Sequence, residues 1–243
     1  MKVALVCIAK NEDMYIQEWV DYHKKLGFDD IIIYQNNWRC QLNDPNVIKI
    51  EFDGVNMQTT AYSHFINHNL ENYQWAAFFD VDEFLVLKKH KNIKEFISDY
   101  INYNSIGINW VLFGDNNLNY NPEEHSVLKR FTKRQKSINP HIKSIVKLRS
   151  NISMGVHNPN CKWVNTNKDT CVGPFNNNGD DSIAIINHYF VKTKDEFLLK
   201  CERGRADTGT HRDISDFNNH NFNEVEDLTA MNFLYDNNNI LNT

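Results

Sequence analysis

The part of the sequence that decides the fold is residues 75–87, which read WAAFFDVDEFLVL. Its first half is an apolar run of the kind that forms a buried strand, and it ends abruptly in acidic residues. In an extended chain Asp80 and Asp82 lie on one face, about 6 to 7 Å apart. Two carboxylates at that spacing can share one divalent cation, or one can hold the cation while the other contacts a ligand hydroxyl. The alternative is a strand end whose acidic side chains are solvated.

Composition limits the classes of protein to consider. At 243 residues, 41% of them hydrophobic, the chain is long enough for one sizeable core, and we expect a single domain over 1–243. A net charge of -5 and a pI near 6.0 argue against a general nucleic-acid binder, which normally carries a basic stripe. Asparagine is abundant, with runs at 116–117, 176–178 and 237–239. We expect it to supply many of the turns and helix caps.

The cysteines and the first strand bear on the cellular compartment. The five cysteines are odd in number and form no Cys-x-x-Cys pair, so neither a zinc site nor a disulfide framework is indicated. Reduced thiols in the cytoplasm are the expectation. The apolar run at 3–9 is too short for a signal peptide, and no stretch approaches the length of a transmembrane helix.

Strand and helix patterns alternate along the chain and predict an α/β fold. A strand over 3–9, an amphipathic helix that ends at Gly27 and a strand over 30–35 form a parallel unit with a right-handed crossover. Further strands are expected at 47–52, 105–113, 144–148 and 183–187, and further helices at 59–72, 93–101, 194–205 and 224–235. Residues 154–181 lose periodicity and predict a long irregular stretch, which in compact domains is often functional.

Several short motifs follow one another along this framework. KNE at 10–12, YI at 15–16, EWVDYH at 18–23 and LGFD at 26–29 open the chain. The later motifs are FFDVDEF at 78–84, Trp110 with FG at 113–114, NHY at 187–189, and EF at 196–197 with Lys200 and RG at 203–204. In this order, over residues 1–206, the set resembles glycosyltransferase family 92 and related family 2-like glycosyltransferases.

The resemblance implies a GT-A fold, with a mixed, mainly parallel sheet flanked by helices. It assigns 1–113 mainly to nucleotide-sugar binding, 114–206 mainly to the acceptor side and a closing segment, and 207–243 to a C-terminal tail. It also implies metal-dependent, inverting transfer of a sugar from a nucleotide-sugar donor, with a uridine-linked donor as first choice, to a hydroxyl of a glycan acceptor. Bound Mn²⁺ or Mg²⁺ would neutralise the charge that develops on the leaving diphosphate.

The same resemblance assigns the metal ligands. Asp82 is the main ligand, and Asp80 either shares the metal or contacts the ribose. His188 follows a predicted strand, where a neutral imidazole can supply a third ligand. His157, in the irregular stretch, is the competing histidine, and a purely structural role is the alternative. Glu83 is expected to form a salt bridge or a cap instead.

Four further residues are candidates for donor contacts. Lys200 and Arg203 would bind the diphosphate oxygens as the C-terminal segment closes, although an ordinary solvated helix face explains their spacing equally well. Asn11 and Glu12 follow the first strand at the carboxyl edge of the sheet, where open α/β sheets bind ligands, so they are candidates for nucleoside contacts. A helix cap is the alternative for both.

An inverting transfer needs a general base near the acceptor hydroxyl. Asp115 follows the strand expected at 105–113 and is the first candidate. Related sequences often carry a small hydroxyl residue there, so Glu123, Glu202 and Asp207 stay open as alternatives.

Two other patterns favour plainer interpretations. His64 and His68 are four residues apart on a predicted helix, as zinc ligands can be, but the Glu of a metalloprotease and a third ligand are missing, which favours a half-exposed helix face. A basic run surrounds Phe131, and a solvated edge is favoured over weak attraction to an anionic acceptor or a membrane surface. The run comprises Lys129, Arg130, Lys133, Arg134 and Lys136.

The sequence therefore predicts a soluble, cytoplasmic GT-A glycosyltransferase whose partners are a nucleotide sugar and a glycan or glycoconjugate, not a nucleic acid. One rival is a nucleotidyltransferase acting on sugar phosphates. It should carry a glycine-rich phosphate loop after the first strand, and residues 9–15 contain no glycine. The other rival is a noncatalytic carbohydrate- or nucleotide-binding module, which would bind nucleotide with metal but transfer nothing.

Overall fold

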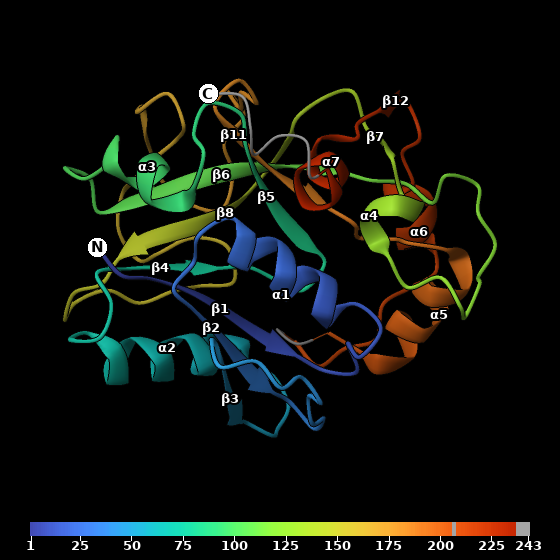
Figure 1. The fold of residues 1–243 in the computed structure, drawn as a ribbon, viewed down its shortest axis with the longest axis horizontal. Coiled ribbons are helices and arrows are strands. Elements are labelled where there is room, and N and C mark those ends of the chain that lie inside the picture. The colour runs from blue at the N-terminus through green and yellow to red at the C-terminus, as the bar shows by residue number, and fades with distance from the viewer. Residues whose placement is uncertain (206–207, 237–243) are drawn as a thin grey trace.

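The computed structural model describes residues 1–205 and 208–236, which form a large sheet, a small sheet and the surrounding helices (Figure 1). Asp207 and the asparagine run at 237–239 lie outside the described residues. The strands of the large sheet are β1 (Val3–Ala9), β2 (Asp30–Gln35), β3 (Val47–Glu51), β4 (Trp75–Phe78), β5 (Glu83–Leu87), β6 (Ser105–Leu112), β8 (Asn139–Lys147), β9 (Trp163–Val164), β10 (Thr170–Cys171) and β11 (Ala184–His188). The small sheet pairs β7 (Lys133–Arg134) with β12 (Val225–Glu226). The helices are α1 (Ile16–Lys25), α2 (Gln58–Asn69), α3 (Ile93–Ser98), α4 (Val127–Arg130), α5 (Lys194–Arg203), α6 (Ser215–His220) and α7 (Thr229–Tyr235).

One half of the large sheet is parallel and covered on both faces. Its order is β4-β1-β2-β3, and Leu5 of β1 lies opposite Ala77 of β4 and Ile31 of β2. All seven residues of β1 are buried, which explains why its sequence is an unbroken apolar run. The predicted unit of β1, α1 and β2 is therefore confirmed.

The other half of the sheet is mixed, and the acidic tripeptide lies where the two halves part. β4 pairs antiparallel with β8, whereas β5 leaves the plane of β4 and pairs antiparallel with β11 (Figure 1). Between β4 and β5 the backbone N–H of Glu83 donates to the carbonyl oxygen of Asp80 over 3.0 Å, which closes a turn. The expectation of an extended chain through Asp80 and Asp82 is thus wrong.

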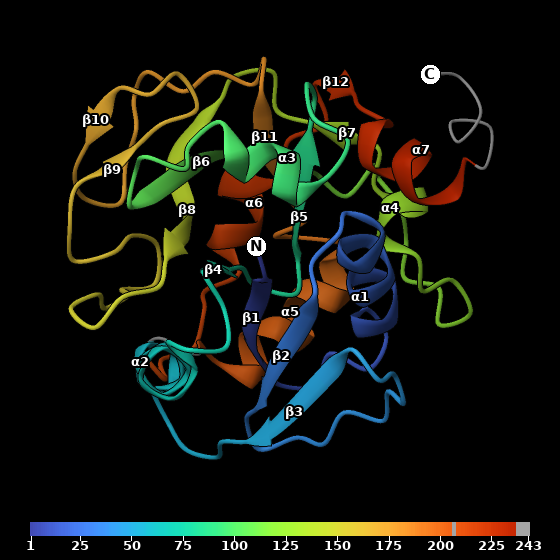
Figure 2. The ribbon, with the colours of Figure 1, turned by 60° about the vertical axis from the view of Figure 1, so that its left-hand side comes forward.

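Helices pack on both faces of the sheet. Figure 2 shows α1 and α2 on opposite sides of the layer formed by β1 and β2. On the α1 face, Trp19 and Tyr22 are buried and donate hydrogen bonds of 2.8 Å to the carbonyl oxygens of Glu83 and Leu85, which fastens α1 to β5. On the α2 face, Phe65 and its neighbours form a second core. The predicted α/β class, with helices flanking a mixed sheet, is confirmed.

Some local expectations were wrong at the margins. Helices α4 and α6 were not expected, and β8 begins at Asn139, five residues before the expected start at 144. The helix expected over 224–235 begins only at Thr229, because Val225 and Glu226 pair with β7. Phe197 of α5 is buried, whereas its neighbour Leu198 is 42% exposed.

Asparagine has the expected role in the turns. Five of the seven non-glycine residues with positive φ among the described residues are asparagines, at positions 11, 37, 56, 116 and 117. Asn92 caps α3, because its side-chain oxygen accepts from the backbone N–H groups of Lys94 and Glu95. Short side chains that bond locally make the left-handed region accessible, so asparagine takes positions that glycine would otherwise fill.

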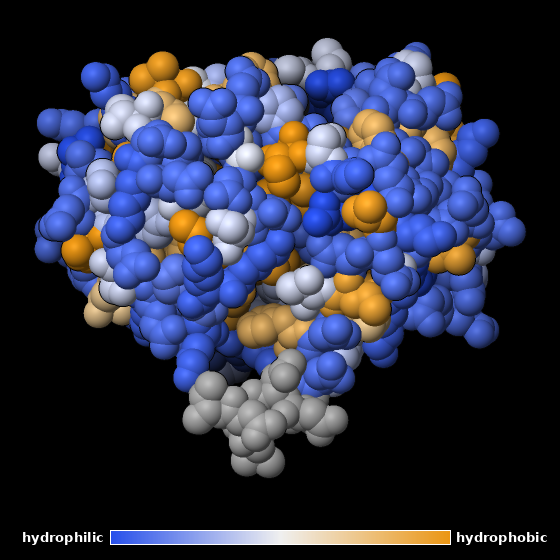
Figure 3. Space-filling model, turned by 90° about the horizontal axis from the view of Figure 1, so that it is seen from above, coloured by the Kyte–Doolittle hydropathy of each residue, from blue (hydrophilic) through white to orange (hydrophobic). Residues whose placement is uncertain are grey.

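The described residues include no helix that is long and apolar enough to cross a membrane. The face seen from above in Figure 3 is mostly hydrophilic, with apolar side chains scattered singly or in small groups. Such scattered apolar residues are ordinary on protein surfaces.

Candidate active site

A cavity of about 380 Å³ opens at the carboxyl ends of β1 and β4. Residues from α5 and α6 and the segment between them line its other side. Of the residues predicted to form the site, six line this cavity, namely Glu12, Asp80, Asp82, His188, Lys200 and Arg203. These residues come from four separate parts of the chain, and the crossover topology brings them to one edge of the sheet.

Asp80 lines the same cavity as the other predicted metal ligands, but its oxygens are bound to other residues. Its Oδ2 accepts from Nζ of Lys143 at 2.8 Å and its Oδ1 from Nε2 of Gln58 at 3.0 Å. The turn at residues 80–83 explains this divergence, because consecutive side chains in a turn do not alternate as they do in a strand. The structure therefore does not place Asp80 with Asp82 and His188, and neither Lys143 nor Gln58 was singled out from the sequence.

Asp82 has a separate partner on each oxygen. Nζ of Lys200 lies 2.7 Å from Oδ2, and Nε2 of His188 lies 3.5 Å from Oδ1. Burial raises the pKa of the Asp82 carboxyl, but Lys200 and His188 outweigh burial and hold it well below its usual value. Burial lowers the pKa of Lys200 to about 8, although Asp82 opposes this effect. Asp82 is therefore ionised at neutral pH.

Glu83 and Lys143 form a buried support beneath the turn. Both side chains are fully buried, with Nζ of Lys143 3.5 Å from Oε2 of Glu83. The same Oε2 accepts from the backbone N–H of Asp80 at 2.8 Å. Lys143 lies where the expected salt bridge of Glu83 requires a cation, but burial raises the pKa of the Glu83 carboxyl well above its usual value, which favours the protonated form. Burial lowers the pKa of Lys143, but Asp80 and Glu83 outweigh it, so the pKa is raised and the ammonium stays charged.

Glu12 and Arg203 form an ion pair at the edge of the cavity. Nη1 of Arg203 also donates to the carbonyl oxygen of Lys10 at 2.7 Å, so α5 is tied directly to the end of β1. Asn11 is exposed and lines a neighbouring cavity instead. Its φ of 55° allows the chain to turn sharply after β1.

The position of α5 is fixed by a second, buried ion pair. The guanidinium of Arg130 donates two hydrogen bonds, of 3.0 and 2.8 Å, to the carboxylate of Glu196. Glu196 also accepts from Tyr15 and completes a capping box with Thr193 at the start of α5. Lys200 lies one turn further along the same helix, so this network fixes the place from which Lys200 reaches Asp82.

This network also corrects the interpretation of the basic run. Arg130 and Phe131 are buried, and Nε of Arg134 bonds to Asp227 at 2.7 Å. Only the lysines of the run are exposed, at positions 129, 133 and 136. The run is therefore not a continuous solvated edge, because its arginines are structural.

The predicted general base is not at the cavity. Asp115 is not among the residues that line it, and Oδ1 of Asp115 accepts from the backbone N–H of Asn117 and from Nδ2 of Asn223. Of the alternatives, Glu123 is exposed in a loop, and Glu202 lines the neighbouring cavity and not this one. Asp207 lies outside the described residues.

Three other histidines that the sequence singled out lie away from Asp82, either elsewhere along the cavity or outside it. His157 lines the cavity, but its ring packs against Trp110 and not beside Asp82. His64 and His68 stack on each other on α2, with ring centroids 4.2 Å apart, and lie outside the cavity. They occupy the half-exposed helix face that was favoured over a zinc site.

Asp82 and His188 fit a divalent cation as two of its ligands. One carboxylate oxygen and one imidazole nitrogen face each other, and the adjoining cavity leaves space for oxygens of water or phosphate, which Mg²⁺ and Mn²⁺ usually retain. Among the described residues no group of three or more His, Cys, Asp or Glu is arranged to hold a metal. The predicted set of three protein ligands is therefore not assembled.

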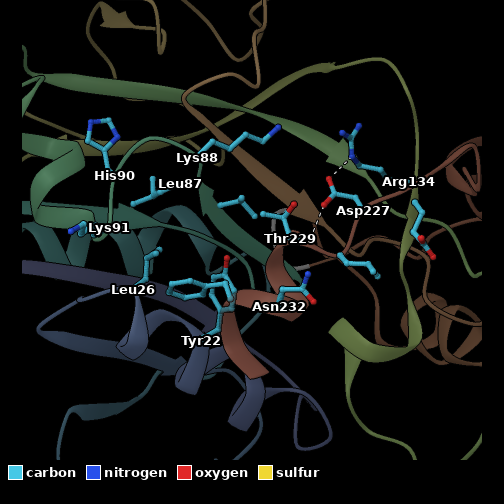
Figure 4. Close-up of a pocket in the computed structure, with 14 residues that line it drawn as sticks. Tyr22, Leu26, Leu87, Lys88, His90, Lys91, Arg134, Asp227, Thr229 and Asn232 are labelled. Carbon is cyan, nitrogen blue, oxygen red and sulfur yellow. Dashed lines mark hydrogen bonds and ion pairs between the residues drawn. The ribbon is translucent and has the colours of Figure 1, made fainter. Parts of the chain in front are cut away.

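A larger cavity, of about 780 Å³, lies between α1, β5 and α7 (Figure 4). Tyr22 and Leu26 line one side, and the Arg134–Asp227 pair lies opposite. None of the predicted site residues lines it. Volume alone does not make an active site, which needs convergent polar groups.

Comparison with known proteins identifies the family of this chain. The model of glycosyltransferase family 92 matches residues 44–225, which is most of the chain. The chain belongs to glycosyltransferase family 92. This membership confirms the predicted family.

Individual relatives are distant. The family 92 protein At1g27200 of Arabidopsis thaliana is 26% identical over 216 residues, covering 79% of this chain and 36% of that protein. The family 92 protein RCOM_0530710 of Ricinus communis shows the same identity and coverage. The chain thus spans little more than a third of the length of these relatives.

Solved structures show weaker likeness. TarS of S. aureus, residues 1–349, is 16% identical with a TM-score of 0.37, covering 61% of this chain and 47% of that one. HddC of Yersinia pseudotuberculosis is 11% identical with a TM-score of 0.32, covering 60% of this chain and 73% of that one. These scores are low and add nothing to the family assignment.

Proposed function

We propose that this family 92 domain transfers a sugar from a uridine-linked nucleotide sugar to a hydroxyl of a glycan, with inversion at the transferred carbon. The observation that carries the proposal is the convergence of Asp82, His188 and Lys200 at the carboxyl edge of the sheet. A paired acid, a neutral histidine and a buried ammonium suit a diphosphate group whose negative charge grows as the sugar leaves.

Asp82 and His188 would hold Mn²⁺ or Mg²⁺ in this proposal. The bound cation would act as a Lewis acid on the leaving diphosphate. Burial lowers the pKa of His188, more than Asp82 raises it, which keeps the imidazole neutral and able to ligate.

The cationic residues of α5 bind and orient the donor. Lys200 is already desolvated, so its ammonium gains a strong interaction with an anionic group that enters the cavity. Arg203 is paired with Glu12, and the remaining N–H groups of its planar guanidinium can donate to phosphate oxygens. The end of β1 contributes Ala9 to the cavity lining, and the segments after β2 and β3 contribute Asn36, Asn37 and Gly54, so this half would take the nucleoside.

Asp216 is a better-placed general base than Asp115. It lines the cavity from the first turn of α6, and Nη2 of Arg205 lies 3.4 Å from its Oδ2. The other cavity-lining acids have cations at 2.8 Å or closer. Asp216 therefore keeps lone pairs available for the proton of an acceptor hydroxyl.

A screen of nucleotide sugars for metal-dependent hydrolysis tests this function, because turnover without acceptor reveals the donor. We expect Mn²⁺-dependent release of UDP from at least one UDP-sugar, and its loss in Asp82→Ala. Asp99→Ala, at the end of α3 and outside the cavity, serves as the control. Donor turnover by Asp82→Ala equal to that of the parent would refute the assignment of the site. Metal-dependent binding without any turnover or transfer would favour a noncatalytic module.

A further inference from the structure

Two histidines that line the cavity, His141 and His157, have no role in the proposed chemistry. His141 lies on β8, and His157 lies in the irregular stretch that follows β8. Both side chains are half-buried. Each ring is anchored through one nitrogen, which leaves the other nitrogen for a ligand.

The anchors fix which nitrogen carries the proton. The backbone N–H of His141 donates to Oδ1 of Asn139, so this atom is an acceptor, and Nδ1 of His141 must donate to it over 2.9 Å. Nδ1 of His157 likewise faces the carbonyl oxygen of Ile142 at 3.3 Å and must donate. In both neutral rings the lone pair is therefore on Nε2, and neither Nε2 has a hydrogen-bond partner within the part of the chain that the structure describes.

The two rings remain neutral at physiological pH. Burial lowers the pKa of His141, and the neighbouring His220 adds to this effect. Burial and then Lys143 lower the pKa of His157 to about 4. Each Nε2 is thus a hydrogen-bond acceptor near pH 7 and not a cation.

The imidazoles of His141 and His157 form one wall of the cavity together with the indole of Trp110. His141 stacks on the indole, with centroids 5.0 Å apart and planes 14° from parallel. His157 lies 5.3 Å from the indole and 5.5 Å from His141. The irregularity in the pairing of β6 with β8 occurs at Trp110, and such bulges often re-aim side chains beside active sites.

The wall lies on the side of the sheet where the sugar is expected. In the order β3-β2-β1-β4-β8-β6, the nucleoside half covers the first three strands, Asp80 follows β4, and His141 and Trp110 come from β8 and β6. A ligand that spans the cavity from β1 therefore reaches this wall beyond its diphosphate. An aromatic surface with fixed acceptors suits a ring with several O–H donors.

We propose that Nε2 of His141 and Nε2 of His157 accept hydrogen bonds from hydroxyl groups of a sugar ring bound against the wall that the two imidazoles form with Trp110. The inference rests on the proposed function for the identity of the ligand. The sugar is either that of the donor or that of the acceptor, and both present the same hydroxyl chemistry.

Replacement by phenylalanine tests the two nitrogens while keeping an aromatic ring against Trp110. We compare His141→Phe and His157→Phe with His68→Phe, which alters an exposed histidine outside the cavity. His157→Gln, which can restore an acceptor near the position of Nε2, tests for rescue. Circular dichroism and thermal unfolding select variants that remain folded.

The first measurement uses sugars alone. Methyl glycosides of glucose, galactose and N-acetylglucosamine are titrated into ¹⁵N-labelled protein, and the histidine ring nitrogens are followed by NMR. We expect Nε2 of His141 and His157 to shift with at least one glycoside, and the resonances of His64 and His68 to stay in place. Unshifted Nε2 resonances with every glycoside and every UDP-sugar would overturn the proposal.

The second measurement separates donor from acceptor. Each phenylalanine variant should bind UDP like the parent, because UDP has no transferred sugar. If the wall holds the donor sugar, affinity for the UDP-sugar falls about 3- to 10-fold, as expected for one lost hydrogen bond. If it holds the acceptor, donor hydrolysis is unchanged and the acceptor KM rises by a similar factor. Equal values for both ligands in both variants would contradict the proposal. Failure of the parent to bind UDP would instead refute the proposed function, while glycoside-induced shifts would still support the wall.

Discussion

Removing the guanidinium of Arg130 should destabilise the protein, because its partner Glu196 is buried. The two side chains are 6% and 2% exposed and joined by two hydrogen bonds. Arg130→Met keeps most of the apolar stem but leaves a buried carboxylate without its cation. Breaking a buried pair in this way costs about 3 to 5 kcal/mol. Glu196 keeps donors from Tyr15 and Thr193, so we expect the lower end, about 3 kcal/mol.

The loss should depend on pH in a defined direction. Burial raises the pKa of Glu196, but the hydrogen bonds from Arg130, Thr193 and Tyr15 outweigh it and lower the pKa to about 2. A carboxyl whose pKa is lowered on folding stabilises the protein above its unfolded pKa of about 4.3, and this contribution disappears as the pH falls toward 2. The difference between parent and Arg130→Met should therefore shrink near pH 3, because Glu196 without its cation is protonated there and no longer carries an unpaired buried charge.

Urea unfolding near pH 7 and near pH 3 measures both effects, with exposed Lys129→Met as the control. The double variant Arg130→Met/Glu196→Gln should recover much of the lost stability near pH 7, because no buried charge is left unpaired. A loss below about 1 kcal/mol for Arg130→Met, or a loss that does not change with pH, would refute the reasoning. Weaker UDP binding by the folded variant would indicate that the Arg130–Glu196 pair positions Lys200.

Other predictions concern the turn, the sheet and the base. Lys143→Met should lower the free energy of unfolding by about 3 kcal/mol in urea titrations, since Asp80 and Glu83 lose the buried ammonium that both contact, whereas exposed Lys133→Met should change it by less than about 0.5 kcal/mol. Gly107→Ala should lower Tm, because the added Cβ would lie 2.4 Å from the ring of Trp163; an unchanged Tm would show that the ring moves freely. Asp216→Asn should reduce transfer about 10² to 10⁴-fold while UDP binding persists, and Asp115→Asn should transfer like the parent; the reverse pattern in a transfer assay would restore Asp115 as the base.

The sequence was sufficient for elements whose residues follow one simple pattern. β1 and β2 were predicted residue by residue, because strands buried on both faces read as unbroken apolar runs. Short elements such as α4 and β7 lack enough residues for a period to show, and their formation depends on partners far along the chain. Sequence-based prediction therefore failed where an element was too short to show a periodic pattern.

The site was predictable in its residues but not in its pairings. Asp82, His188 and Lys200 were all identified, yet nothing local indicates that Asp80 turns toward Lys143 instead. A lysine inside the apolar run at 142–146 is the one signal that was overlooked, because a charge buried in a strand needs a partner. Asp115 was misplaced relative to the cavity because the loop after β6 turns toward Asn221 and Asn223.

The most direct test of the account is the affinity for UDP in the presence and absence of Mn²⁺, measured by calorimetry for the parent, Asp82→Asn and Asp80→Asn. The account predicts that Mn²⁺ strengthens UDP binding by the parent, that Asp82→Asn removes this gain, and that Asp80→Asn retains it, because only Asp82 faces His188. A gain that survives in Asp82→Asn but disappears in Asp80→Asn would contradict it.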